Sequence, residues 1–257
     1  MADTDGLGGL FFYILFVYPL CSWILAPGRF KRERGITYAI GVLAAIAIAK
    51  LSFEWYDRGA NYYQMMGVRR YATPLEIKRA YKKISLELHP DKNPSEDAAD
   101  QFAHMKEAYD VLMDMEYRPI YDKLGPDAVK ARKRLDETAI LIEMLVFYVS
   151  WGVLAYLLTL GKGAATARSW IFTGLILMLI IEVAMVLNGE GSALPAWLFP
   201  WWTEHEVVWM LHSVFPAYMN GCRSLGSFLY VDVDKQTRDL LLQLKEGHQV
   251  GARFGFG

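Results

Sequence analysis

The stretch "TPLEIKRAYKKISLELHPDKNP", residues 73–94, has the pattern of an amphipathic helix that ends abruptly. Its first residue, Thr73, is followed by proline and, three residues on, by Glu76, which is the signature of a capping box at a helix N-terminus. Apolar residues then recur at positions i, i+4, i+7 and i+11, which predicts a single face packed against a core. The residues of this face are Ile77, Tyr81, Ile84 and Leu88.

The opposite face of the same helix is cationic. It carries Lys78, Arg79, Lys82 and Lys83. Pro90 disfavours the helical conformation of the residue before it, so the helix is predicted to end at Leu88–His89. Two interpretations remain open: His89 and Asp91 are incidental neighbours of a helix stop, or the triplet is an exposed polar turn that binds a partner. The cations are likewise either an ordinary solvated face or a surface that steers an acidic partner.

A second helix is predicted after this turn, from about residue 96 to residue 112. Its apolar positions fall at i, i+3, i+7 and i+10: Phe102, Met105, Tyr109 and Leu112. Two apolar stripes of this kind predict an antiparallel helical hairpin with a shared seam. The flanking segments "NYYQMMGV" and "YRPIYDKLG" predict two shorter helices that add Tyr63 and Tyr121 to the core. Together these four helices predict a four-helix domain over residues 60–126.

In this order and spacing, these segments resemble the J-domain of DnaJ-type co-chaperones. The resemblance implies that His89, Pro90 and Asp91, together with the cationic face, dock on a DnaK-type 70-kDa heat-shock chaperone and stimulate its ATP hydrolysis. Glu87 stands where the family usually carries a basic residue. The chain has neither a Gly/Phe-rich linker after the domain nor CxxC repeats, so it resembles the divergent third class of J-proteins.

The rest of the chain is strongly apolar, and 54% of all residues are hydrophobic. A helix needs about 20 apolar residues to cross the hydrocarbon core of a bilayer. Four segments approach or exceed this length. For one of them, residues 36–53, a buried helix of a soluble core is the alternative. The four segments are residues 6–28, 36–53, 138–161 and 170–189. The predicted fold is therefore an all-α polytopic membrane protein with about four transmembrane helices and an inserted four-helix J-domain.

The remaining boundaries follow from these spans. Residues 1–54 hold two transmembrane helices joined by a basic loop, and residues 138–189 hold two more. In residues 190–257, four tryptophans indicate a belt at headgroup level. We predict an interfacial or re-entrant helix pair there and a short helical tail, with a fifth crossing as the alternative. The tryptophans are Trp197, Trp201, Trp202 and Trp209.

Charge asymmetry predicts which side of the membrane each loop faces. Basic loops at residues 29–34 and 162–168 fall on the same side, which the positive-inside rule assigns to the cytosol. The helical domain then lies on the opposite side, although four basic residues near it oppose this assignment: Lys130, Arg132, Lys133 and Arg134. The layout is similar to that of the J-domain subunit of the endoplasmic-reticulum Sec translocon. We therefore predict an endoplasmic-reticulum protein with a lumenal J-domain, with the mitochondrial inner membrane as the alternative.

Several classes of protein are excluded by the sequence. Two cysteines, Cys21 and Cys222, cannot build a disulfide framework or a cysteine-based zinc site. The net charge of −1 gives no field for nucleic acid. A phosphate-binding loop, a nucleophile motif and a metal-ligand cluster are all absent, so neither enzymatic activity nor a cofactor is expected.

The expected partners are a DnaK/BiP-type chaperone and the lipid bilayer. A second hypothesis makes the chain a structural subunit of a larger membrane complex, such as a respiratory or import complex. Glu143 and Glu182, near the ends of the last two spans, would then face other subunits.

Overall fold

The structure is a computed structural model of the 257-residue chain. It describes residues 11–26, 29–88, 97–133, 136–161, 164–187 and 199–229, together with five positions nearer the C-terminus, namely 237, 240–242 and 245. Within these ranges every regular element is a helix, which confirms the predicted all-α class.

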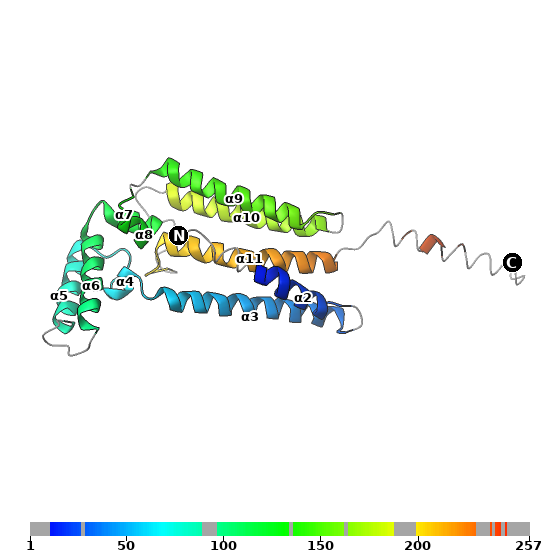
Figure 1. The fold of residues 1–257 in the computed structure, drawn as a ribbon, viewed down its shortest axis with the longest axis horizontal. Coiled ribbons are helices and arrows are strands. Elements are labelled where there is room, and N and C mark those ends of the chain that lie inside the picture. Colours follow the sequence, from blue (N-terminus) through cyan, green and yellow to red (C-terminus); the bar gives the residue numbers. More distant parts are fainter. Residues whose placement is uncertain are drawn as a thin grey trace, which may run out of the picture.

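Most of these helices form an elongated apolar bundle (Figure 1). Its members are η1 (Tyr13–Val17), α2 (Tyr18–Ile24), α3 (Arg32–Arg58), α9 (Glu137–Leu158), α10 (Ala165–Leu187) and α11 (Glu204–Leu229). Three of the described helices are long and apolar enough to cross a membrane: Glu33–Arg58, Thr138–Leu158 and Ala165–Leu187. Large apolar side chains on their outer faces are exposed, as on a surface that meets lipid. The length, composition and exposed apolar surface of these helices suggest a membrane association.

The first predicted span appears as a shorter apolar helix. Its described part, Tyr13–Ile24, opens with a π-helical turn and continues as α2. Pro19 directly follows the π-helical turn within this continuous helical run, and its missing N–H removes one hydrogen bond of the run. Residues 1–10 lie outside the described ranges. Among the described residues, three helices are thus both long and apolar enough to span a membrane.

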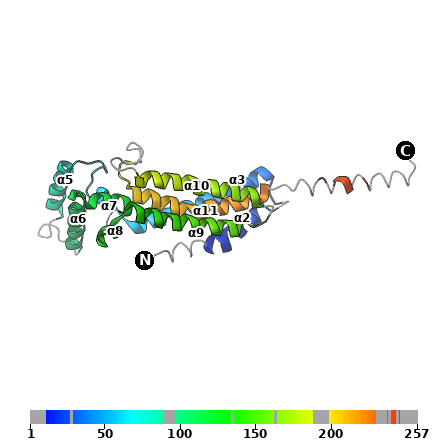
Figure 2. The same ribbon diagram turned by 90° about the horizontal axis from the view of Figure 1, so that it is seen from above.

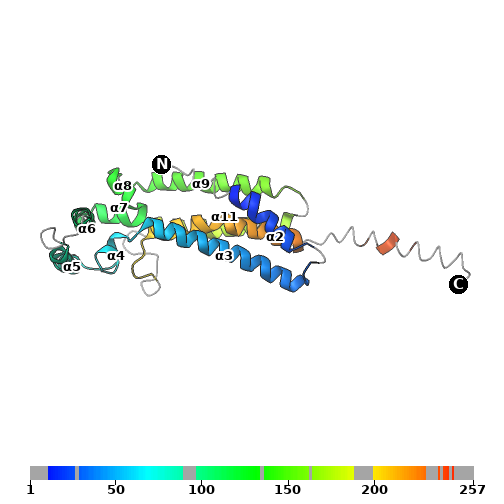
Figure 3. The same ribbon diagram turned by 60° about the horizontal axis from the view of Figure 1, so that its bottom comes forward.

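Helix α11 differs from the predicted interfacial or re-entrant pair. It is one continuous helix of 26 residues that contains Pro216, and it packs against α10 and α3 (Figure 3). Polar side chains of α11 have partners inside the bundle. Ser213 bonds to Lys50 and Glu54, and the fully buried Asn220 donates to the Pro216 carbonyl oxygen at 2.8 Å. Residues of α3 thus satisfy Ser213, and Asn220 is satisfied within its own helix, so neither polar side chain is left unpaired.

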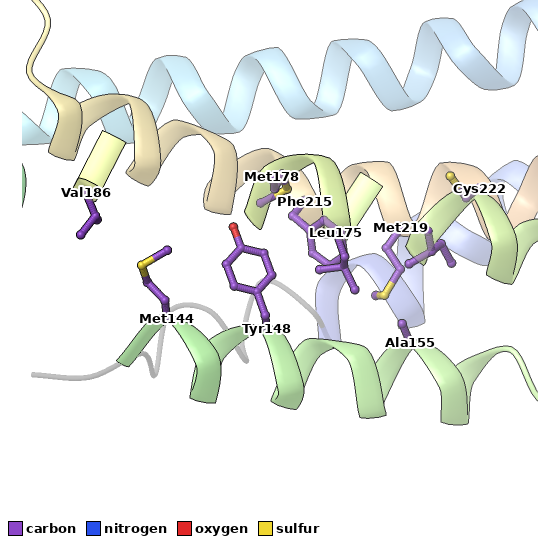
Figure 4. Packing of buried hydrophobic residues seen from close by; sticks show 10 residues of the cluster. Met144, Tyr148, Ala155, Leu175, Met178, Val186, Phe215, Met219 and Cys222 are labelled. Atoms are coloured by element: carbon purple, nitrogen blue, oxygen red, sulfur yellow. The ribbon is translucent and has the colours of Figure 1, made fainter. Parts of the chain in front are cut away.

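The core of the bundle lies between α9, α10 and α11 (Figure 4). It contains ten buried residues: Met144, Tyr148, Ala155, Ile171, Leu175, Met178, Val186, Phe215, Met219 and Cys222. Close approach of α10 and α11 depends on a small residue. A Cβ added at Gly226 would lie 2.6 Å from the Cβ of Ala167, so only glycine fits this crossing.

A small helical domain sits at one end of the bundle (Figures 1 and 2). It contains α4 (Tyr62–Met65), α5 (Pro74–Glu87), α6 (Ala98–Met113), α7 (Tyr117–Leu124) and α8 (Pro126–Lys130). Helices α5 and α6 pack together, and α7 contacts the start of α11. The domain is thus held against the bundle through α7 rather than through α5.

Buried polar contacts fix the domain on the bundle. The Arg70 guanidinium lies 3.1 Å from Glu204 Oε1, and the two side chains are only 6% and 5% exposed. The Arg70 amide donates to the Pro200 carbonyl oxygen at 2.9 Å. Asn61 donates to both carboxylate oxygens of Glu206, at 3.0 and 2.9 Å. Both glutamates belong to the first turn of α11, so the N-terminus of this helix is the anchor.

Two further contacts tighten the same junction. Lys123 Nζ donates to the Val186 carbonyl oxygen of α10 at 2.8 Å. Gly125 has a φ of +82°, and a Cβ at this position would lie 2.6 Å from the His205 ring. Glycine is therefore required here both by the backbone conformation and by the close approach of the ring.

Replacing Glu204 by glutamine tests this junction. Breaking a buried ion pair by removing one partner costs roughly 3 kcal/mol, because it leaves a buried charge without its counter-charge. We expect Glu204→Gln to accelerate hydrogen exchange at the Arg70 amide and to lower the melting temperature of the full-length protein. The matched control, Glu116→Gln, alters an exposed acid of the same domain and should change neither. Equal exchange rates in the two variants would contradict this role of the ion pair.

Candidate functional site

Helix α5 begins as the sequence predicted. Thr73 is its N-cap, and its hydroxyl oxygen accepts from the Glu76 amide at 3.3 Å. Glu76 Oε2 accepts in return from the Thr73 amide at 2.7 Å, which completes the capping box. These hydrogen bonds with Thr73 hold the pKa of the exposed Glu76 carboxyl below its usual value. The register of α5, and with it the direction of its two faces, is thus set at its first turn.

The predicted core residues of the domain lie together in one cluster. Ile77, Met105, Leu112, Tyr63 and Tyr121 are buried, and Tyr81, Ile84, Leu88, Phe102 and Tyr109 pack around them. The Tyr81 and Tyr109 rings stack with centroids 4.1 Å apart and close the seam between α5 and α6. This packing turns the apolar stripe of α5 inward and leaves its other face free.

The cationic face of α5 is solvent-exposed. All four predicted docking cations on this helix are exposed: Lys78, Arg79, Lys82 and Lys83. Figure 1 shows α5 on the side of the domain that faces away from the bundle. The anchoring contacts therefore leave this face uncovered.

The predicted triplet His89, Pro90 and Asp91 lies outside the described residues. The described range that contains α5 ends at Leu88, and description resumes at residue 97. The Leu88 amide donates to the Ile84 carbonyl oxygen at 2.9 Å. Helix α5 ends at Glu87, close to the predicted boundary. In the sequence, the triplet thus follows the end of α5 after a single residue, Leu88.

Sequence reasoning missed a polar network that connects α7 to the turn before α5. Arg118 donates from Nε to the Tyr63 hydroxyl oxygen at 3.1 Å and from Nη2 to two backbone carbonyl oxygens, those of Arg70 and Ala72, at 2.9 Å each. The Tyr63 hydroxyl donates to Asp122 at 2.8 Å. The i, i+4 spacing of Arg118 and Asp122 in α7 was the available signal, but it does not reveal which residues face them.

Burial dominates the electrostatics of this network. It raises the pKa of Asp122 to about 6, while Arg70, the hydrogen bond from Tyr63 and Arg118 oppose the rise. A carboxyl whose folded-state pKa is raised favours the folded state most at low pH, and this contribution is lost as the pH rises through about 6. The role of Asp122 is therefore to position Arg70 and Tyr63, and it acts at some free-energy cost near neutral pH.

The site as a whole is an exposed cationic surface. Among the described residues, no group of three or more His, Cys, Asp or Glu side chains is arranged to hold a metal ion. What the domain presents is a rigid helix with four exposed cations, supported by a packed core. Such a surface suits recognition of an acidic partner surface.

Comparison with known proteins identifies the domain. The profile of the DnaJ domain matches residues 61–122. The DnaJ homolog subfamily B member 7 of Mus musculus is 50% identical over 74 residues, which are 28% of this chain and 24% of that protein. The chaperone protein DnaJ of Ehrlichia ruminantium (strain Gardel) is 49% identical over 70 residues, 27% of this chain and 18% of that protein.

A third relative has a name that refers to a cellular process. The mitochondrial protein import protein MAS5 of Saccharomyces cerevisiae is 50% identical over 69 residues, which are 27% of this chain and 17% of that protein. The chain thus spans a quarter or less of the length of these relatives, and the similarity is confined to the helical domain. Residues 61–122 are therefore a DnaJ domain.

Proposed function

We propose that this protein is a membrane-anchored co-chaperone. Its J-domain recruits a DnaK- or BiP-type 70-kDa chaperone and stimulates that protein's ATP hydrolysis, so the chain activates an enzyme without being one. The observation that carries this proposal is the exposed cationic face of α5, a helix on the side of the domain away from the bundle (Figure 1), which the His89-Pro90-Asp91 triplet follows in the sequence. The bundle would keep this face at the membrane surface, where proteins fold or are translocated.

The proposed compartment is the lumen of the endoplasmic reticulum. Helices α3 and α10 begin at the end of the bundle opposite the J-domain, so both basic loops belong to that end (Figure 1). Two of the opposing basic residues near the J-domain lie close to acids, although the positive-inside rule counts Lys and Arg alone. Lys130 Nζ lies 4.0 Å from Glu107, and Lys133 Nζ lies 3.7 Å from Glu143. This charge distribution supports a J-domain on the non-cytosolic side, with the mitochondrial inner membrane as the alternative location.

Stimulated ATPase activity is the direct test. We expect the full-length protein in nanodiscs to accelerate ATP hydrolysis by a BiP-type chaperone. Reversing two cations in the double variant Lys78→Glu/Lys82→Glu should weaken docking about tenfold or more, because like charges placed in contact cost several kcal/mol. The matched control Lys106→Glu reverses an exposed lysine of α6 and should retain the stimulation.

A variant of the triplet distinguishes the co-chaperone hypothesis from the hypothesis of a structural subunit. His89→Gln should abolish the stimulation while leaving the fold of the bundle unchanged. If His89→Gln stimulated the chaperone as well as the wild-type protein, and the chain co-purified at fixed stoichiometry with a membrane complex, the structural hypothesis would replace ours.

Protease protection tests the proposed side of the membrane. An epitope inserted after Asn93 should resist protease added to sealed endoplasmic-reticulum vesicles and become sensitive once detergent opens them. An epitope in the basic loop at residues 29–34 is the matched control and should be cleaved without detergent. Cleavage of the Asn93 epitope in sealed vesicles would reverse the topology.

A further inference from the structure

A buried acid inside the bundle is not explained by the co-chaperone function. Glu182 of α10 is 7% exposed and lies within the candidate span Ala165–Leu187. Its Oε2 accepts a hydrogen bond from the Tyr148 hydroxyl of α9 at 2.8 Å, and it lies 3.1 Å from Nε2 of His212 of α11. Figure 4 shows Tyr148 extending from α9 into the core of the bundle. One carboxyl group therefore connects three helices.

The histidine of this group is held in place by aromatic contacts. The His212 ring stacks on Phe147 with centroids 3.9 Å apart and an interplanar angle of 12°. It stands edge-on to Tyr148 at 6.2 Å and 80°. The ion-pair partner that the structure gives Glu182 is thus a fixed imidazole, which is cationic only when it carries an additional proton.

The net charge of the Glu182–His212 pair depends on that proton. Without it, the ionised carboxylate and the neutral imidazole carry one negative charge. With it, the pair is neutral overall, whether the proton resides on the imidazole or on the carboxyl group. A low-dielectric interior penalises an unbalanced charge, and a bound proton is what makes this pair neutral. Ionisable residues buried between transmembrane helices typically mark ion or proton sites.

A cavity leads from this pair toward the J-domain. Its volume is about 520 Å³, and Glu182 and His212 are among its lining residues. It reaches Glu143 and Lys133, whose side chains are 71% and 55% exposed. The other titratable groups that line it are Lys123, Asp127, Glu204 and His205. Polar groups thus continue from the buried pair to the exposed surface on the J-domain side.

We propose that Glu182, Tyr148 and His212 form a proton-binding site that exchanges with the compartment on the J-domain side. Glu182 and His212 share the bound proton. Tyr148 positions the carboxylate by donating to the oxygen that faces His212. The cavity provides the route for the proton, because it joins the pair to exposed groups at the surface.

Thermal unfolding at several pH values tests the site. The full-length protein in nanodiscs is compared with Glu182→Gln between about pH 5 and 8, the range in which histidine pairs titrate. A proton bound more tightly by the folded state stabilises it at low pH, and this stabilisation is lost as the pH rises. We therefore expect the melting temperature of the wild-type protein to fall relative to that of Glu182→Gln as the pH rises. The matched control Glu143→Gln, at the exposed end of the same cavity, should follow the wild-type curve.

A second variant retains both titrating groups. Tyr148→Phe removes a donor that favours the ionised carboxylate, so the midpoint of the pH dependence should move to higher pH. This measurement decides the question even if Glu182→Gln does not fold. A difference between wild type and Glu182→Gln that is the same at every pH would overturn the proposal, as would an unchanged midpoint in Tyr148→Phe.

Discussion

The buried ion pair between Arg70 and Glu204 is the contact on which the arrangement of the two units depends. Arg70 belongs to the turn before α5, and Glu204 belongs to the first turn of α11. A buried charge pair tolerates little displacement, because each group needs the other to offset its lost hydration. The pair therefore fixes the J-domain in one orientation, and the side on which α5 lies follows from that orientation.

The same arginine connects the junction to the interior of the J-domain. Arg70 lies 3.7 Å from Asp122, which accepts from Tyr63, and Arg118 bonds to the Arg70 carbonyl oxygen. The network that holds α7 against the turn before α5 thus continues into the contact with α11. The same polar network therefore holds the J-domain together and attaches it to the bundle. Through both roles it positions the cationic face of α5.

Much of this structure could be predicted because its causes are local. The capping residues Thr73 and Glu76 and the apolar stripes of α5 and α6 lie within a few turns of the residues they organise. Composition alone located the apolar helices. The continuous helix Glu204–Leu229 was not predicted, because the sequence around Pro216 does not show that residues of α3 and α10 bind its polar side chains. The contacts of Asn61, Arg70 and Glu182 escaped prediction for the same reason, since their partners are far away in the chain.

The seating of the J-domain also changes the thermodynamics of recruiting a partner. A domain on a flexible linker loses rotational freedom each time it binds, and that loss weakens the complex. Here the orientation is already fixed by folding, through contacts at the Arg70, Asn61 and Lys123 side chains. The surface of α5 is therefore preorganised: any partner that binds it meets it at a constant angle to the bundle. The orientation of the bundle is in this way imposed on the bound partner.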